Sequence, residues 1–71
     1  MYSQGITIEY LNQLHNELSR EQTKLVDTMK QTTSVEKEKL YTRQISMLNQ
    51  LILLVLKFRN LQRQIQLEAS Y

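Results

Sequence analysis

Glycine and proline together occur only once in the 71 residues, as Gly5. These two residues normally mark turns and end helices, so a chain that almost lacks them has few places to change direction. A β-sandwich or barrel of this length needs several turns rich in glycine, asparagine or proline, and we therefore exclude it. Twelve leucines and nine glutamines favour helix instead. The sequence predicts an all-α protein.

The size and composition of the chain argue against an enzyme. We expect a single domain, residues 1–71, with a frayed N-terminus over residues 1–6. A domain this small buries too little surface to form a large closed pocket. The chain has no cysteine, which excludes disulfides and thiolate metal sites. A hydrophobic share of 41% with a net charge of only +2 disfavours intrinsic disorder.

The most apolar segment is Leu51–Leu56. Six residues cannot cross a bilayer, which requires about 20. The first ten residues lack the basic segment and the long apolar core of a secretory signal. We therefore expect a soluble, cytoplasmic protein that has no membrane contact.

The first helix is predicted over residues 8–31. Thr7 is a suitable N-cap, and Ile6 and Leu11 occupy the two positions of a hydrophobic staple. Spacings of three and four residues then alternate along one face, which is the heptad pattern of helices that pack side by side. The members of this seam are Ile8, Leu11, His15, Leu18, Gln22, Leu25 and Met29.

A break is predicted between Lys30 and Ser34, where three consecutive hydroxyl residues weaken the helix. Thr33 and Glu36 match a capping box, which places the N-cap of the second helix at Thr33. The second helix is predicted over residues 35–69. Neither glycine nor proline marks the turn, so one continuous helix of about 60 residues remains an alternative to an antiparallel hairpin.

The second helix carries two apolar stripes. The main seam consists of Leu40, Gln44, Met47, Leu51, Leu54, Phe58, Leu61 and Ile65. The second stripe consists of Tyr41, Ile45, Leu48, Ile52 and Val55. The stripes merge between Met47 and Leu56, where the helix is apolar nearly all round and must be covered on more than one side. A single antiparallel helix covers only one stripe.

The unequal lengths of the two helices predict an uncovered apolar end. If the chain folds back at the break, facing residues have numbers that sum to about 65, and the first helix ends opposite about residue 57. Side chains beyond that point have no cover from their own chain. They are Phe58, Leu61, Ile65 and Leu67. We therefore expect a homodimer or a higher oligomer of hairpins, with the dimer forming a four-helix bundle.

The interface between chains is expected along the second helix, centred on residues 47–65. Its predicted members are Met47, Leu51, Leu54, Val55, Phe58, Leu61 and Ile65. The polar seam residues are expected to face the other helix. His15 would lie near Asn49 and Gln50, as a hydrogen-bonded histidine rather than a metal ligand or general base. Gln22, near Arg43 and Gln44, is either a polar layer that sets the register or a residue at the bundle margin.

Basic residues gather in the C-terminal half of the chain, because residues 35–71 carry six cations and three carboxylates. Lys57, Arg59 and Arg63 could contact an anionic partner such as nucleic acid. Three cations on one helix form a thin patch without an aromatic platform, so a solvated helix face is the better interpretation.

The sequence offers no catalytic constellation, no phosphate-binding glycine loop and no metal-ligand set. We predict a non-enzymatic, helical interaction protein, such as a regulator, inhibitor or assembly factor, that needs no cofactor and binds another protein through its second helix. The alternatives are a nucleic-acid-binding regulator that uses the basic residues, and a structural or scaffold subunit.

Overall fold

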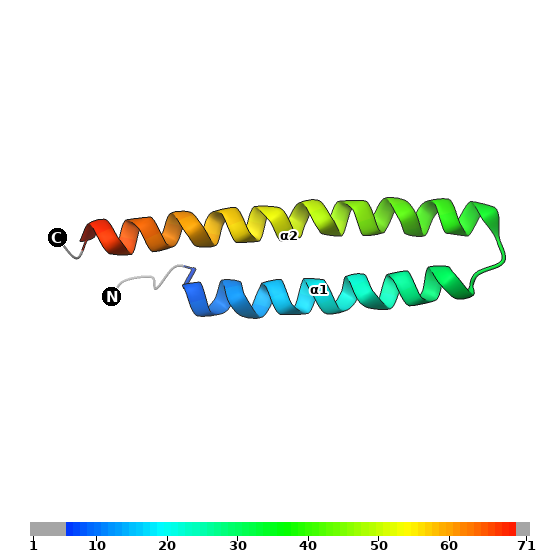
Figure 1. The fold of residues 1–71 in the computed structure, drawn as a ribbon, viewed down its shortest axis with the longest axis horizontal. Helices are drawn as coiled ribbons and strands as arrows, with labels where there is room; N and C mark the ends of the chain where they lie inside the picture. Colours follow the sequence, from blue (N-terminus) through cyan, green and yellow to red (C-terminus); the bar gives the residue numbers. More distant parts are fainter. Residues whose placement is uncertain (1–5, 70–71) are drawn as a thin grey trace.

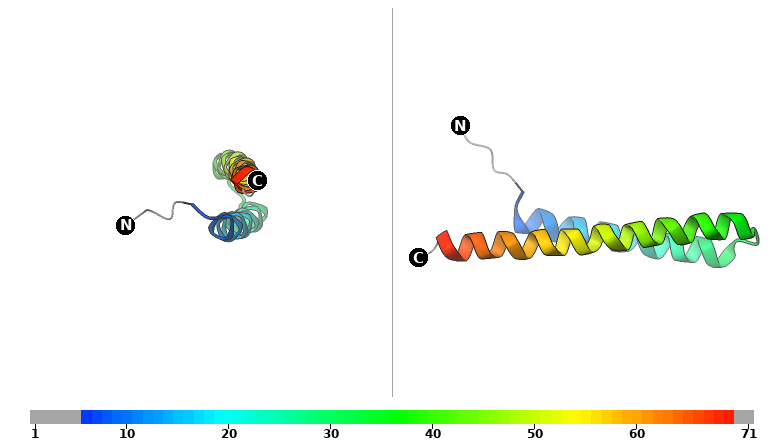
Figure 2. Two further views of the ribbon diagram at one scale, coloured as in Figure 1. Left: turned by 90° about the vertical axis from the view of Figure 1, so that its left-hand side faces the viewer. Right: turned by 90° about the horizontal axis from the view of Figure 1, so that it is seen from above.

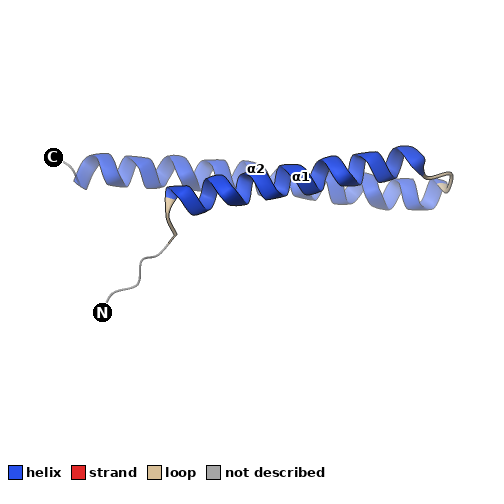
Figure 3. Ribbon diagram, turned by 90° about the horizontal axis from the view of Figure 1, so that it is seen from below, coloured by secondary structure: helices blue, strands red, loops and turns tan. Residues whose placement is uncertain are grey.

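The computed structural model describes residues 6–69 and shows two helices folded into an antiparallel hairpin (Figure 1). Helix α1 spans Ile8–Gln31 and α2 spans Val35–Ala69. Residues 32–34 join them, and no strand occurs between residues 6 and 69 (Figure 3). The predicted all-α hairpin is confirmed, and the continuous helix is excluded. The expected fraying of the N-terminus falls, for residues 1–5, outside the described residues.

The start of α1 follows the predicted cap. The backbone N–H of Tyr10 donates to the Thr7 hydroxyl oxygen at 3.0 Å, and Thr7 itself is extended, with φ −93° and ψ 160°. This bond satisfies one of the backbone donors that every helix start leaves unpaired. Glu9 lies in the first turn, where its charge complements the helix dipole.

Helix α2 begins at Val35 as predicted, but its N-cap lies one residue later than expected. Its N-cap is Ser34, whose hydroxyl oxygen accepts from the N–H of Lys37 at 3.3 Å. Thr33 is therefore not the cap. With Ser34 as the cap, the third helical position is Lys37 rather than Glu36, so the predicted capping box does not form. Adjacent hydroxyl residues offer equivalent acceptors, and the backbone path through residues 32–34 decides which one precedes the first helical residue.

The packing face of α1 is the predicted seam. Leu11 is only 3% exposed, and the other six seam positions are partly buried. His15 and Gln22 are among them, so both turn away from solvent as expected. The Gln22 side-chain amide donates to the backbone carbonyl of Ile45 at 3.3 Å. Gln22 therefore makes a polar contact within the hairpin rather than lying at its margin.

The face that α2 turns toward α1 is the second stripe, extended by two polar residues. We call it the inner stripe. It consists of Tyr41, Ile45, Leu48, Ile52, Val55, Arg59 and Gln62. Ile52 is 8% exposed and the other six are partly buried. This spacing of fours and threes continues without a break, because Arg59 and Gln62 follow Val55 at the heptad interval.

The predicted main seam is exposed at every position, and we call it the outer stripe. It consists of Leu40, Gln44, Met47, Leu51, Leu54, Phe58, Leu61 and Ile65. Helix α1 therefore does not cover this stripe. Within residues 6–69, only Leu11 and Ile52 are buried, because two helices side by side leave most of each circumference open (Figure 2).

The register between the helices is also displaced from the prediction. Arg59 bonds to Asn12 and Gln62 bonds to the carbonyl of Ile6, so the paired numbers sum to 71 and 68. Helical side chains lean toward their own N-terminus. In an antiparallel pair this lean carries α1 side chains away from the turn and α2 side chains toward it. Each α1 residue therefore meets a later residue of α2 than its Cα position implies.

This shift corrects the reason for the exposed apolar end. Because Gln62 still contacts the start of α1, the α2 overhang begins beyond residue 62 rather than at residue 58 (Figure 1). Phe58 and Leu61 lie alongside α1, and they are exposed because they project from a different side of α2. Ile65 and Leu67 lie beyond residue 62, and Leu67 still lines a shallow hollow with Ile8 at the start of α1.

Candidate functional site

The outer stripe forms an apolar face along α2 that is interrupted only at Gln44. Its seven apolar members are each between 43% and 60% exposed, with Phe58 the most covered and Leu54 and Ile65 the most open. Apolar patches of this extent are uncommon on monomeric soluble proteins and typically mark binding surfaces. Since all of them project from one helix at heptad spacing, the face is a straight ridge rather than a closed pocket.

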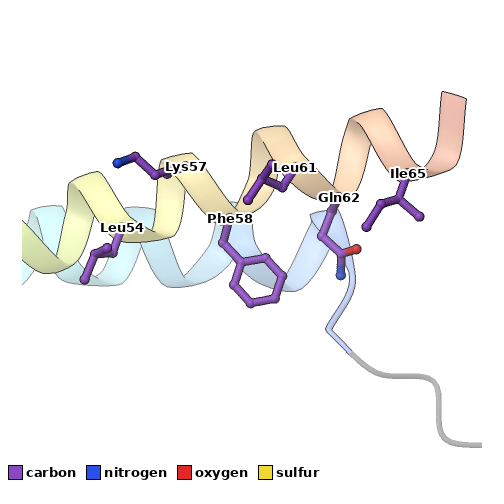
Figure 4. Close-up of a pocket in the computed structure, with 6 residues that line it drawn as sticks. All are labelled: Leu54, Lys57, Phe58, Leu61, Gln62 and Ile65. Carbon is purple, nitrogen blue, oxygen red and sulfur yellow. The ribbon is translucent and has the colours of Figure 1, made fainter. Parts of the chain in front are cut away.

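A shallow hollow occupies the C-terminal half of this ridge. Its lining residues are Leu54, Lys57, Phe58, Leu61, Gln62 and Ile65. Figure 4 shows that all six project from α2, and that Phe58 and Lys57 leave the helix on different sides. The surface that lines the hollow is almost entirely apolar, including the parts that Lys57 and Gln62 contribute. Such a surface fits an apolar side chain of another helix.

Two further hollows lie between the helices, next to the outer stripe. One is lined on one side by Ile6, before α1, and by Tyr10, Leu11 and Leu14 of α1, and on the other by Leu51, Leu54, Val55 and Phe58 of α2. The other is lined from α1 by Glu21 and Leu25 and from α2 by Gln44, Met47, Leu48 and Leu51. The candidate site is therefore a groove-bearing face of the hairpin, to which α1 contributes as well as α2.

The structure brings six of the seven predicted interface residues onto one face. They are Met47, Leu51, Leu54, Phe58, Leu61 and Ile65. Val55 differs, because it belongs to the inner stripe and is partly buried against α1. It still lines the groove between the helices, so its exposed part lies at the floor of the candidate site rather than on its ridge.

The three basic residues do not form a patch. A terminal nitrogen of the Arg59 guanidinium donates to the Asn12 side-chain oxygen at 2.9 Å. Its Nε is buried and has no hydrogen-bond partner among the described residues. Arg59 is thus committed to the contact between helices, whereas Lys57 and Arg63 are exposed. From the sequence we expected Arg59 to be a surface cation. The one sign that it faces α1 is its position four residues after Val55, at the heptad interval of the inner stripe.

Polar tethers at the open end of the hairpin were not anticipated. Arg59 donates to the Asn12 side chain on α1. Gln62 donates to the backbone carbonyl of Ile6, just before α1, at 2.6 Å. Near the turn, the Thr42 hydroxyl lies 3.3 Å from the Met29 sulfur. These contacts hold the two helices at a defined register.

The described residues contain no group of three or more histidine, cysteine or acidic side chains placed to hold a metal ion. His15 lies partly buried on the seam of α1. Neither α1 nor α2, over the described residues, is long and apolar enough to span a bilayer. No protein-family model, curated protein or solved structure matches the chain.

Proposed function

We propose that this protein is a small, non-enzymatic interaction protein that acts through the outer stripe of α2. The observation that carries the proposal is the exposure of this stripe along the whole length of the hairpin. Complete burial of a leucine or phenylalanine side chain is worth about 1.5–3 kcal/mol. Because these side chains are about half exposed, each gains roughly 1 kcal/mol when a partner covers it.

The chemistry of the face favours a helical partner. Its hollows repeat at intervals along a straight ridge, which suits an amphipathic helix that inserts a side chain at each interval. Phe58 is the strongest candidate anchor, because aromatic side chains dominate the binding energy of many interfaces. Lys57, at the margin of the C-terminal hollow, supplies a polar rim. A regulator, an inhibitor and an assembly factor would all use such a face, and so would a scaffold subunit.

The direct experiment is a pull-down from the native lysate with the wild-type chain, Phe58→Asp and Asn60→Asp. Both variants add one carboxylate to the same stretch of α2, but Asn60 is exposed outside the outer stripe. We expect partners to be lost with Phe58→Asp and retained with Asn60→Asp. The same set of bound proteins with all three chains would contradict the proposal.

A nucleic-acid-binding regulator is the second candidate, supported by the exposure of Lys57 and Arg63 and by the net charge of +2. Two free cations give a weak and strongly salt-dependent attraction to phosphates. Binding to a DNA or RNA duplex that weakens steeply between low and moderate salt, and that a Lys57→Gln, Arg63→Gln double variant abolishes, would favour this candidate.

A further inference from the structure

We propose that the partner on the outer stripe is a second copy of this chain, packed antiparallel with its two-fold axis midway between Leu51 and Leu54. The inference rests on the proposed function, since it takes the outer stripe to be a docking face for a helix. It goes further in naming the occupant and the alignment. The product is a four-helix bundle in which the two α2 helices are central neighbours.

The outer stripe is complementary to itself. A two-fold interface joins one patch to an identical patch, so the spacing of the apolar residues must match when read in reverse. With the axis at this position, Leu51 faces the partner's Leu54 and Met47 faces the partner's Phe58. At the ends of the stripe, Leu40 faces the partner's Ile65. Only Gln44 faces an unlike residue, the partner's Leu61.

The residues that flank the outer stripe also favour an antiparallel alignment. Arg43, Gln50, Lys57 and Gln64 are exposed along one of its edges at heptad spacing. In the antiparallel alignment each cation faces an amide, with Lys57 opposite the partner's Gln50 and Arg43 opposite the partner's Gln64. A parallel alignment sets Lys57 level with the partner's Lys57 and brings helix ends of like sign together.

An antiparallel partner also covers the α2 overhang. Residues 63–69 extend beyond the start of α1, and Ile65, the last member of the outer stripe, is 60% exposed there. At the opposite end of the stripe, Leu40 is 59% exposed beside the turn. The antiparallel alignment lays residues 63–69 of one copy along residues 36–42 of the other. One arrangement therefore covers both exposed ends.

The area that two copies can bury against each other is large enough for a stable dimer. The stripe from Leu40 to Ile65 is about 38 Å long on a helix about 10 Å wide. Treated as flat strips, the two copies together bury roughly 800 Å² of surface, and the projecting side chains add to this area. The hollows between the helices add surface from α1, notably at Tyr10, Leu14 and Leu25. The total reaches the range of about 1,000 Å² or more at which specific interfaces are stable.

The alignment can be measured directly, because the chain contains no cysteine and a single substitution gives a unique labelling site. We would attach spin labels to Gln50→Cys and, in a separate sample, to Gln64→Cys, and measure distances between copies by pulsed electron resonance. The two Gln50 labels should stand roughly 8 Å apart along the bundle axis and the two Gln64 labels roughly 35 Å apart. Short distances at both positions would mean a parallel dimer and would overturn the proposal.

Sedimentation of the unlabelled chain separates this inference from the proposed function. The wild type should be dimeric at micromolar concentration, and Leu54→Asp should weaken association by roughly 100-fold, while Asn60→Asp associates like the wild type. A monomeric wild type would refute the second copy as occupant. Capture of another protein that depends on Phe58 would in that case still support the proposed function, and its absence would remove both.

Discussion

The Arg59 guanidinium donates a hydrogen bond to the side-chain oxygen of Asn12 at 2.9 Å, across 47 residues of sequence. This contact joins α1 near its start to the last third of α2, so it fixes how far the two helices slide past each other. Arg59 occupies a position that an apolar residue would normally fill, and its Nε is buried without a partner among the described residues. The hairpin therefore depends on Asn12 to satisfy the guanidinium.

Replacing Asn12 with alanine should destabilise the hairpin by about 1 kcal/mol, because it removes the acceptor from a partly buried charged donor. Denaturation monitored by circular dichroism measures this. A double-mutant cycle with Arg59→Met should show that the two losses are not additive. As a control, Arg63→Met removes an exposed cation and should change stability by less than about 0.5 kcal/mol. Additive losses would contradict a direct contact.

Adjacent residues of α2 should respond very differently to truncation. Ile52 is 8% exposed on the inner stripe, whereas Leu53 is exposed on another side of the helix. Ile52→Ala should cost about 2 kcal/mol or more through lost burial and the cavity that remains. Leu53→Ala should be nearly neutral in the same unfolding experiment. Equal losses for the two variants would show that α1 does not pack on the inner stripe.

The cap of α2 can be tested at neighbouring hydroxyl residues. Ser34→Ala removes the side chain that accepts from the Lys37 N–H and should cost about 1 kcal/mol. Thr33→Ala should change the free energy of unfolding by less than about 0.5 kcal/mol. The reverse order would restore Thr33 as the cap.

Stability should depend on concentration if two copies share a bundle. Dilution favours dissociation, and dissociation exposes the outer stripe, so the thermal midpoint of the wild type should fall on dilution. The midpoint of Phe58→Asp should be low and independent of concentration, while Asn60→Asp should behave as the wild type. These midpoints are measured by circular dichroism over a range of protein concentrations. A wild-type midpoint that stays constant over that range would count against self-association.

The helix boundaries could be predicted from local chemistry alone. Thr7 offers a cap acceptor just before an apolar heptad pattern, and the hydroxyl residues after Gln31 compete for backbone bonds. The scarcity of glycine and proline excluded a β-sandwich or barrel. The seam of α1 was also predictable, because α1 has one apolar stripe and a helix with one stripe has one way to bury it.

The sequence alone did not determine which side of α2 meets α1. The middle of α2 is apolar nearly all round, so periodicity supported both stripes, and the outer one is richer in leucine. Tertiary contacts decided between them, because Arg59 and Gln62 extend the inner stripe to where Asn12 and the Ile6 carbonyl accept their hydrogen bonds. A polar residue at a heptad position makes that stripe look unsuited to packing against another helix, as long as the group that it hydrogen-bonds to is unknown. That group lies on the other helix, at a register set by the lean of side chains toward each helix N-terminus.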